Sequence, residues 1–199
     1  MTKPKKKMFV WCDERKEPVQ LSVEEFEKRF GIVYCERVLK NEDQIFQIDK
    51  NCVEEWRKWR ECVKEDTKDK LFVKYVNEKV GNGLFALRDI QEGEFVSVYG
   101  GELKKTEEVK SNNNTNYEIQ TFLEEFVIDG KKFRSLAGFI NHSASISNAD
   151  FCSFVCDQTP ICVFFATQYI RKGEQILFDY SFGYNTQDFE EMEKNFVEF

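Results

Sequence analysis

The chain has 199 residues, which is enough for one catalytic domain of ordinary size with flanking elements. Hydrophobic residues make up 41% of the chain and 20 residues are phenylalanine, so the composition predicts a folded protein and excludes a disordered one. The formal net charge of −7 argues against broad nucleic-acid binding, which needs a basic surface, and favours basic protein partners.

Residues 1–70 are expected to form a helical N-terminal lobe. Ser22-Val23-Glu24-Glu25 has the form of a capping box, and Phe26 and Phe30 follow Val23 at helical spacing. A second helix is indicated by an apolar stripe at Cys52, Trp56, Trp59 and Val63. We interpret both stripes as core. Lys3–Lys7 has the composition of a nuclear-import signal, but short lysine runs of this kind are more often a solvated tail.

After residue 70 the sequence changes to short strands and turns, which predicts an α+β, mostly β fold rather than a doubly wound one. The expected strands are residues 71–76, 94–99, 126–129, 151–156, 161–166 and 175–178. Gly81-Asn82-Gly83 reads as a turn, Gly130 suggests a hairpin, and residues 111–116 form a polar loop. No internal repeat is evident. A last helix is expected near the C-terminus, with one face formed by Phe189, Met192 and Phe196.

The cysteines favour core packing over metal binding or disulfides. There are seven, an odd number, in a chain too large to need disulfides, so we expect reduced thiols and an intracellular protein, in the nucleus or the cytoplasm. Cys152-x-x-x-Cys156 is the nearest approach to a metal pair. In a strand, however, Cys152, Phe154 and Cys156 share one face, so we predict no metal site. No run of ~18 apolar residues occurs, and no membrane span is expected.

Familiar catalytic patterns are weak here. Gly81-Asn82-Gly83 lacks the third glycine and the following helix of a dinucleotide-binding loop. His142 is the only histidine, which excludes a histidine-rich metal site. A Ser-His-Asp hydrolase built on His142 would be expected to carry a G-x-S-x-G elbow, and the sequence has none.

Four short motifs occur together in a fixed order. They are G-N-G-L-F-A at residues 81–86, Y-G-G-E at 99–102, F-I-N-H-S at 139–143 and G-E-Q-I-L-F-D-Y at 173–180. In this order they resemble the motifs of the SET-domain family of protein-lysine methyltransferases, over residues 71–180. The resemblance implies short β-sheets with a knot-like crossing of the last two motifs, S-adenosylmethionine as cofactor, and a lysine in a protein as substrate.

The resemblance also implies roles for individual residues. The implied cofactor-binding residues are Asn82, Gly83, Leu84, Asn141, His142 and Tyr180. The implied catalytic residues are Tyr180 and Tyr117, and the implied lining of the lysine channel is Phe178, Phe182 and Tyr184. In the family, the aromatic residue two positions before the catalytic tyrosine tends to set the number of methyl groups added, so phenylalanine at 178 implies a di- or trimethyl product.

Several positions depart from the family pattern. Gly138 and Ala144 stand where many members carry arginine and cysteine, and no cysteine follows Cys162 to build a zinc-binding tail. We therefore expect a SET domain at 71–180, and a C-terminal segment at 181–199 whose helix closes the channel. The departures keep a second interpretation open, a non-catalytic SET module that binds a protein partner. Histone tails are the leading substrate class because they are basic and extended, and non-histone proteins are the other class.

Overall fold

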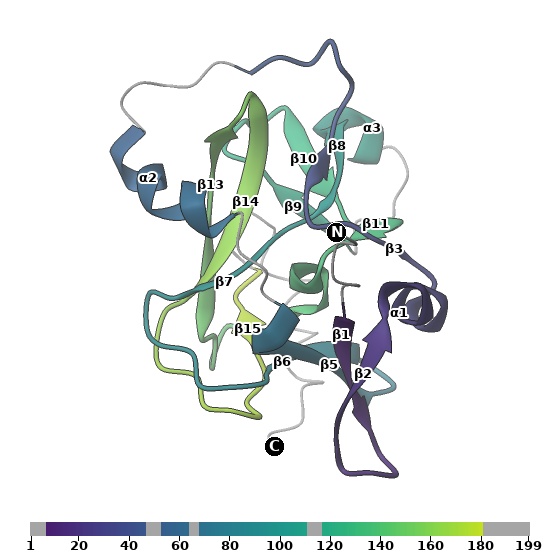
Figure 1. Ribbon diagram of the computed structural model, residues 1–199. Helices are drawn as coiled ribbons and strands as arrows, with labels where there is room; N and C mark the ends of the chain where they lie inside the picture. The colour runs from purple at the N-terminus through teal and green to yellow at the C-terminus, as the bar shows by residue number, and fades with distance from the viewer. Residues whose placement is uncertain (1–6, 47–52, 64–67, 111–116, 181–199) are drawn as a thin grey trace, which may run out of the picture.

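The computed structural model describes residues 7–46, 53–63, 68–110 and 117–180, which form mostly short strands (Figure 1). The first elements are β1 (Lys7–Cys12), β2 (Glu17–Ser22), α1 (Val23–Phe30), β3 (Val33–Tyr34), β4 (Val38–Leu39), α2 (Val53–Cys62) and η2 (Lys68–Lys70). They are followed by β5 (Leu71–Asn77), β6 (Gly81–Ala86), β7 (Phe95–Val98), β8 (Gly101–Lys105), α3 (Thr106–Lys110), β9 (Glu118–Gln120) and β10 (Phe126–Asp129). The last are β11 (Phe133–Arg134), η3 (Leu136–Phe139), β12 (Asn141–His142), β13 (Ala149–Cys156), β14 (Thr159–Ala166) and β15 (Leu177–Phe178).

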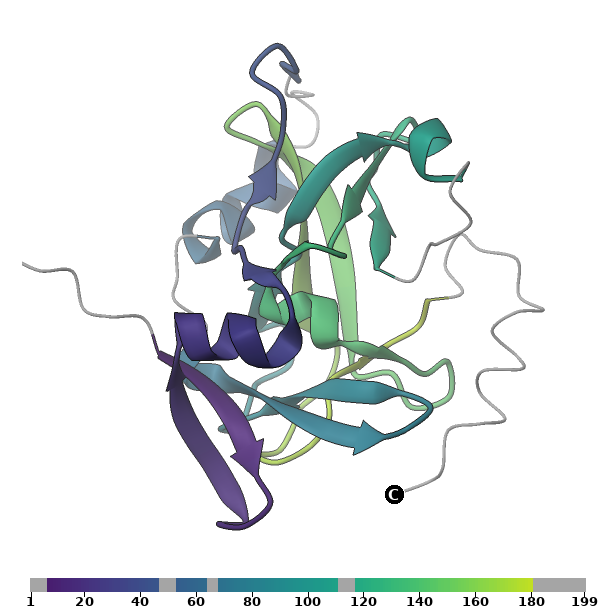
Figure 2. The same cartoon turned by 90° about the vertical axis from the view of Figure 1, so that its right-hand side faces the viewer.

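The strands pair into four small sheets, with the orders β2-β1-β5-β6, β4-β8-β10-β9, β11-β3 and β12-β15-β13-β14-β7. In Figures 1 and 2 the first of these sheets lies at the bottom of the molecule, and β8, β10 and α3 lie at the top. The expected α+β, mostly β architecture is confirmed. Within the described ranges, no helix is long and apolar enough to cross a membrane.

Helix α1 begins at the predicted capping box. The Ser22 hydroxyl accepts a hydrogen bond from the Glu25 amide at 3.2 Å, and the Glu25 carboxylate accepts one from the Ser22 amide at 2.7 Å. The helix ends at Gly31, whose φ of 64° is the left-handed conformation that glycine adopts without strain. Phe26 is fully buried, and its ring contacts Phe139 of η3 at a centroid distance of 5.9 Å. Helix α1 therefore supports the chain just before the N-H-S motif.

The rest of the N-terminal part differs from the expected helical lobe. Helix α2 is present, and its Trp59 is buried with its ring stacked 5.3 Å from Phe165, as the apolar stripe predicts. The strands β1 to β4 are not predicted from the sequence. β1 pairs with β5, β3 with β11 and β4 with β8, all in parallel, so residues 7–39 share sheets with the chain beyond residue 70. Of the Lys3–Lys7 segment, the structure describes only Lys7, which begins β1.

The structure differs from the sequence predictions at two expected turns, the G-x-G turn and the hairpin at Gly130. The turn before β6 is Glu78–Val80, where the Asn77 side chain accepts hydrogen bonds from the Lys79 and Val80 amides, both at 2.9 Å. Gly81 then opens β6 with a φ of 74°, so the G-x-G segment is strand and the predicted turn is wrong. β10 pairs with β8 and β9, whereas β11 pairs with β3, so no hairpin forms at Gly130.

A short internal repeat, hidden in the sequence, joins residues 86–94 to residues 166–174. Ile90 and Ile170 exchange backbone hydrogen bonds at 2.9 Å in both directions. The Ala86 amide donates to Glu174, and the Ala166 amide donates to Glu94, again at 2.9 Å each. The two copies are therefore related by a local two-fold arrangement. The second copy fixes the point from which the closing motif starts.

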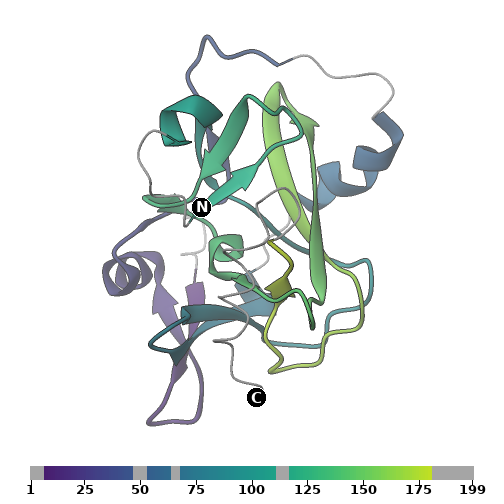
Figure 3. The same cartoon turned by 180° about the vertical axis from the view of Figure 1, so that it is seen from behind.

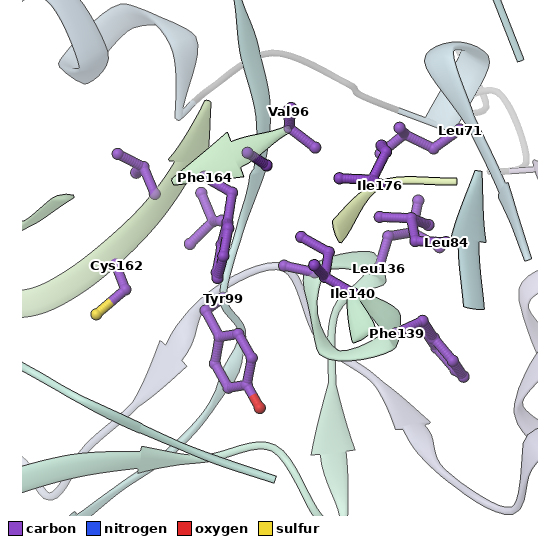
Figure 4. Packing of buried hydrophobic residues seen from close by; sticks show 14 of the residues in the cluster. Leu71, Leu84, Val96, Tyr99, Leu136, Phe139, Ile140, Cys162, Phe164 and Ile176 are labelled. Atoms are coloured by element: carbon purple, nitrogen blue, oxygen red, sulfur yellow. The ribbon is translucent and has the colours of Figure 1, made fainter. Parts of the chain in front are cut away.

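The core is continuous around η3. Figure 4 shows Leu136 and Ile140 between Leu84 and Ile176 on one side and Phe164 on the other. All five side chains are less than 4% exposed. The helix that precedes the N-H-S motif is thus held from both sides by buried apolar contacts, which makes it a rigid base for the residues that follow.

Candidate functional site

Three of the sequence motifs meet in space. β12 pairs in parallel with β15, with Asn141 opposite Leu177 and His142 opposite Phe178. β6 lies against the same closing segment, because the Ile176 amide donates to the Leu84 carbonyl at 2.8 Å. In Figure 3, β15 lies between η3 and the long strands β13 and β14. Motifs that are far apart in the sequence therefore form one site.

Asn148 ties the crossing of the last two motifs together. Its side-chain amide donates to the Gln175 carbonyl at 2.8 Å, and its side-chain oxygen accepts from the Leu177 amide at 2.9 Å. Its backbone amide also donates to the Leu177 carbonyl at 3.0 Å, and the side chain is buried. Asn148 is not predicted as a site residue from the sequence. The only signal is a lone asparagine after a serine-rich stretch, which ordinarily reads as a turn.

Gly83 lies where polar side chains converge. A Cβ at this position would sit 2.6 Å from the Gln175 side-chain nitrogen and 3.0 Å from that of Asn141, so only glycine fits without displacing them. The Asn141 side chain donates to the Asn82 carbonyl at 3.3 Å. Leu84 differs, because its side chain is fully buried in the core and its carbonyl bonds to Ile176. Asn82, Gly83 and Asn141 are therefore brought together, while the Leu84 side chain points away from them.

His142 orients Tyr180. The buried imidazole accepts a hydrogen bond at Nδ1 from the Tyr180 backbone amide at 2.9 Å. A nitrogen that accepts carries no proton, so this contact selects the neutral tautomer with the proton on Nε2. The Asp179 carboxylate lies 3.8 Å from the same Nδ1, which with this tautomer is not an ion pair. His142 thus acts as an acceptor that fixes the backbone at Tyr180.

The Tyr180 hydroxyl is held in a fixed position. It donates to the carbonyl of Ile140, one residue before Asn141. The side chain is half-buried, but burial around the hydroxyl raises the pKa of Tyr180, and the Tyr117 hydroxyl raises it further. The group therefore stays protonated at any working pH. Because its proton points at Ile140, the oxygen presents acceptor lone pairs in its other directions.

Aromatic rings form the wall beside this hydroxyl. The buried Phe178 ring contacts Phe151 and Phe164 edge-on, both with centroids 5.3 Å away, and lies 5.7 Å from the Tyr180 ring. Tyr117 is 39% exposed, and its carbonyl accepts a hydrogen bond from the Tyr99 hydroxyl at 2.8 Å. Phe182, Tyr184 and the predicted C-terminal helix lie outside the described residues.

A match to a known family model shows which protein family the chain belongs to. The family model described as "SET domain" matches residues 81–181, about half of the chain. This chain belongs to the SET-domain family. The match covers the residues that build the site described above.

Similar proteins are found among curated sequences and solved structures. Histone-lysine N-methyltransferase ASHH3 of Arabidopsis thaliana is 33% identical over 112 residues, which is 53% of this chain and 31% of that protein. Putative histone-lysine N-methyltransferase ASHH4 of the same plant is 35% identical over 53% of this chain and 32% of that protein. The chain thus spans about a third of the length of these relatives.

A solved structure extends the likeness in fold. ATXR5, in its complex with histone H3.1 mono-methylated on R26, superimposes with a TM-score of 0.61 over 83% of this chain and 87% of that one, at 15% identity. That similarity concerns the fold alone.

The cofactor of SET methyltransferases is S-adenosylmethionine, and the residues of this SET domain fit it. Gly83 has no Cβ, which leaves room for the side-chain amides of Gln175 and Asn141 to converge beside its backbone, and these amides are hydrogen-bonding groups for a polar ligand. Asn141 offers an amide for a polar ligand, and Tyr180 offers a buried hydroxyl. Within the described ranges, no group of three or more His, Cys, Asp or Glu residues could hold a metal ion.

Two departures from the family pattern have different surroundings. A Cβ at Gly138 would lie 2.5 Å from Cγ of Arg134, so the Arg134 side chain fills the space beside this glycine. Ala144 is exposed. The six cysteines that the structure describes are free thiols, and burial raises the pKa of Cys162 to about 12, which keeps that thiol unreactive.

Proposed function

We propose that this SET domain is a protein-lysine N-methyltransferase, which transfers a methyl group from S-adenosylmethionine to a lysine ε-amine in a basic protein segment. The observation that carries the proposal is the Tyr180 hydroxyl, fixed on the Ile140 carbonyl beside His142 and the Phe178 ring. Family membership and the histone-lysine N-methyltransferases among its relatives support the same reaction.

Histone tails are the proposed substrate class. The net charge of −7 favours a basic partner, and the relatives are named for histone lysines. A histone substrate implies that the protein works in the nucleus, and cytoplasmic histones or other basic proteins are the further candidates.

The first chemical task is to bind the lysine amine uncharged. A lysine ammonium has no lone pair, and its ordinary pKa is about 10.4. Apolar walls such as Phe178 and Phe151 disfavour the charged form, so the amine loses its proton more readily on entering the channel. A dedicated base is then not required.

The second task is alignment. S-adenosylmethionine supplies a methyl group on a positively charged sulfur. The Tyr180 oxygen, whose proton is directed to Ile140, would be free to accept a weak C–H···O contact from that methyl group and so orient it. Holding amine and methyl in line contributes ~7–11 kcal/mol to lowering the barrier, as in other well-oriented reactions. Asn141 and the Gly83 backbone would hold the rest of the cofactor.

Replacement of Asn141 by alanine should weaken cofactor binding. A lost buried polar contact costs ~1–3 kcal/mol, which corresponds to a ~5- to 150-fold rise in the dissociation constant. Calorimetric titration of S-adenosylmethionine measures it. The matched control is Asn41→Ala, an exposed asparagine outside the site, which should bind like the wild type. Equal affinities of Asn141→Ala and wild type would remove Asn141 from the cofactor site.

Phenylalanine at 178 should permit more than one methyl transfer. A tyrosine hydroxyl at this point could hold a water molecule or the amine, and that water occupies the volume a second methyl group needs. We therefore expect di- or trimethyl-lysine from the wild type and mainly monomethyl-lysine from Phe178→Tyr, measured by mass spectrometry over a time course. Phe122→Tyr, at an exposed ring, is the control. A wild-type protein that stops at monomethyl-lysine under excess cofactor contradicts this argument.

The experiment that tests the proposed function combines two measurements on one preparation. Calorimetry records S-adenosylmethionine binding, and a radiolabelled-methyl assay records transfer to mixed core histones and lysine peptides. Binding with transfer is the expected result. Binding without transfer to any of these substrates, or to proteins of a cell extract, would instead identify the non-catalytic SET module.

A further inference from the structure

Arg134 is a buried cation next to the proposed lysine channel. It closes β11 and is 7% exposed. Its Nε donates to the Gly130 carbonyl at 2.8 Å, and one Nη donates to the Lys131 carbonyl at 3.2 Å. Its guanidinium carbon lies only 3.6 Å from the centroid of the Tyr117 ring. A planar cation anchored at two backbone carbonyls thus lies against the Tyr117 ring, with the Phe139 ring farther away at 5.4 Å.

The neighbouring glycine makes room for this arrangement. A Cβ at Gly138 would lie 2.5 Å from Cγ and 2.8 Å from Cδ of Arg134. These atoms are near the base of the side chain, so they could not move aside without moving the guanidinium. Gly138 does not have a positive φ. Its role here is therefore space for Arg134 and not backbone conformation.

Tyr117 needs such an anchor more than the other aromatic residues of the site. Phe178 is packed edge-on by two rings, whereas Tyr117 is 39% exposed. Its backbone is held, since its carbonyl accepts from the Gly130 amide at 2.7 Å and from Tyr99. The ring itself rests on Arg134 at the closest cation–ring distance of the described residues.

We propose that Arg134 is a positioning residue of the lysine channel, which holds the Tyr117 ring in place as a channel wall through the guanidinium–ring stack that Gly138 makes room for. The inference rests on the proposed function. Tyr117 raises the pKa of Tyr180 and Arg134 lowers it, which indicates that both lie within electrostatic reach of its hydroxyl. The family resemblance implies that Tyr117 belongs to the lysine channel and not to the cofactor residues, so Arg134 should act on substrate use alone.

The first test is a double-mutant cycle on methyl transfer. Arg134→Met keeps the length of the stem and removes the planar cation, and Tyr117→Leu removes the ring. Each single variant should lower kcat/KM for a lysine substrate about tenfold with an unchanged S-adenosylmethionine dissociation constant, and the double variant should be no worse than either single one. Lys132→Met is the control, since Lys132 is exposed and lies 5.1 Å from the Phe133 ring.

The second test uses Gly138 and does not depend on activity. Gly138→Ala should lower the melting temperature in the wild-type background and leave it unchanged in an Arg134→Ala background, because the crowded atoms are then gone.

Losses in kcat/KM that multiply in the first cycle, or an equal loss of cofactor affinity, would overturn the positioning role. A wild type that transfers no methyl group overturns the proposed function itself, whatever the melting temperatures show.

Discussion

Tyr180→Phe should lose methyl transfer by on the order of 10²-fold, the effect typical of removing one positioned polar group from an active site. The hydroxyl is the group fixed on the Ile140 carbonyl, and phenylalanine leaves that carbonyl without this donor while keeping the ring. The ring still contacts Phe178 and His142, so the channel should keep its shape. S-adenosylmethionine affinity should therefore change little.

Single-turnover kinetics and calorimetry on the same preparation separate the two quantities. Tyr75→Phe is the control for the loss of a tyrosine hydroxyl, because Tyr75 is 53% exposed and is not one of the proposed site residues. Burial raises the pKa of Tyr180, so the loss should be the same at every pH at which the protein is stable. Near-wild-type turnover of Tyr180→Phe would remove this hydroxyl from the mechanism.

Asn148→Ala should destabilise the protein by about 3 kcal/mol, because it leaves the Gln175 carbonyl and the Leu177 amide without their buried partner. The bonds lost join residues 27 and 29 positions apart, so no local turn can replace them. Since the same bonds fix the segment that carries Phe178 and Tyr180, methyl transfer should also fall.

Urea denaturation followed by circular dichroism measures the free energy of unfolding. Asn77→Ala is the matched control, because the Asn77 side chain also makes two hydrogen bonds, as the acceptor of two amides, but only within its own turn. It should cost about 1 kcal/mol or less, as a single partly exposed hydrogen bond does. Equal losses for the two variants would show that Asn148 is an ordinary turn residue.

Local patterns explain how much of the fold could be predicted from the sequence. The α1 boundary rests on Ser22 and Glu25, three residues apart, and the structure has both reciprocal bonds. The strands at β5, β7, β13 and β14 follow from apolar runs and are confirmed within a few residues. β1 is not predicted from the sequence because its residues, K-M-F-V-W-C, mix strand alternation with an apolar run. Its parallel partner β5 begins 59 residues after β1 ends.

The residues of the candidate site also fall into two groups, those that local motifs predict and those that only the folded chain reveals. Site residues that lie within the motifs can be predicted because the motifs occur in family order, and the structure brings those motifs together. These residues are Asn82, Gly83, Asn141, His142, Phe178 and Tyr180. Asn148 and Arg134 could not, because each acts through contacts that only the folded chain creates. Gly138 reads in the sequence as a departure from the pattern. In the structure it is the space that the Arg134 side chain fills.

The most direct test of the account is mass spectrometry of core histones after incubation with the purified chain and S-adenosylmethionine carrying a deuterated methyl group. We expect labelled methyl groups on lysine ε-amines of a histone tail, with Tyr180→Phe giving about 10²-fold less label in the same time. Labelled lysines in a non-histone protein of a cell extract would keep the reaction and change only the substrate. No labelled lysine in either mixture, from a protein that binds the cofactor, would contradict the assignment as a lysine methyltransferase.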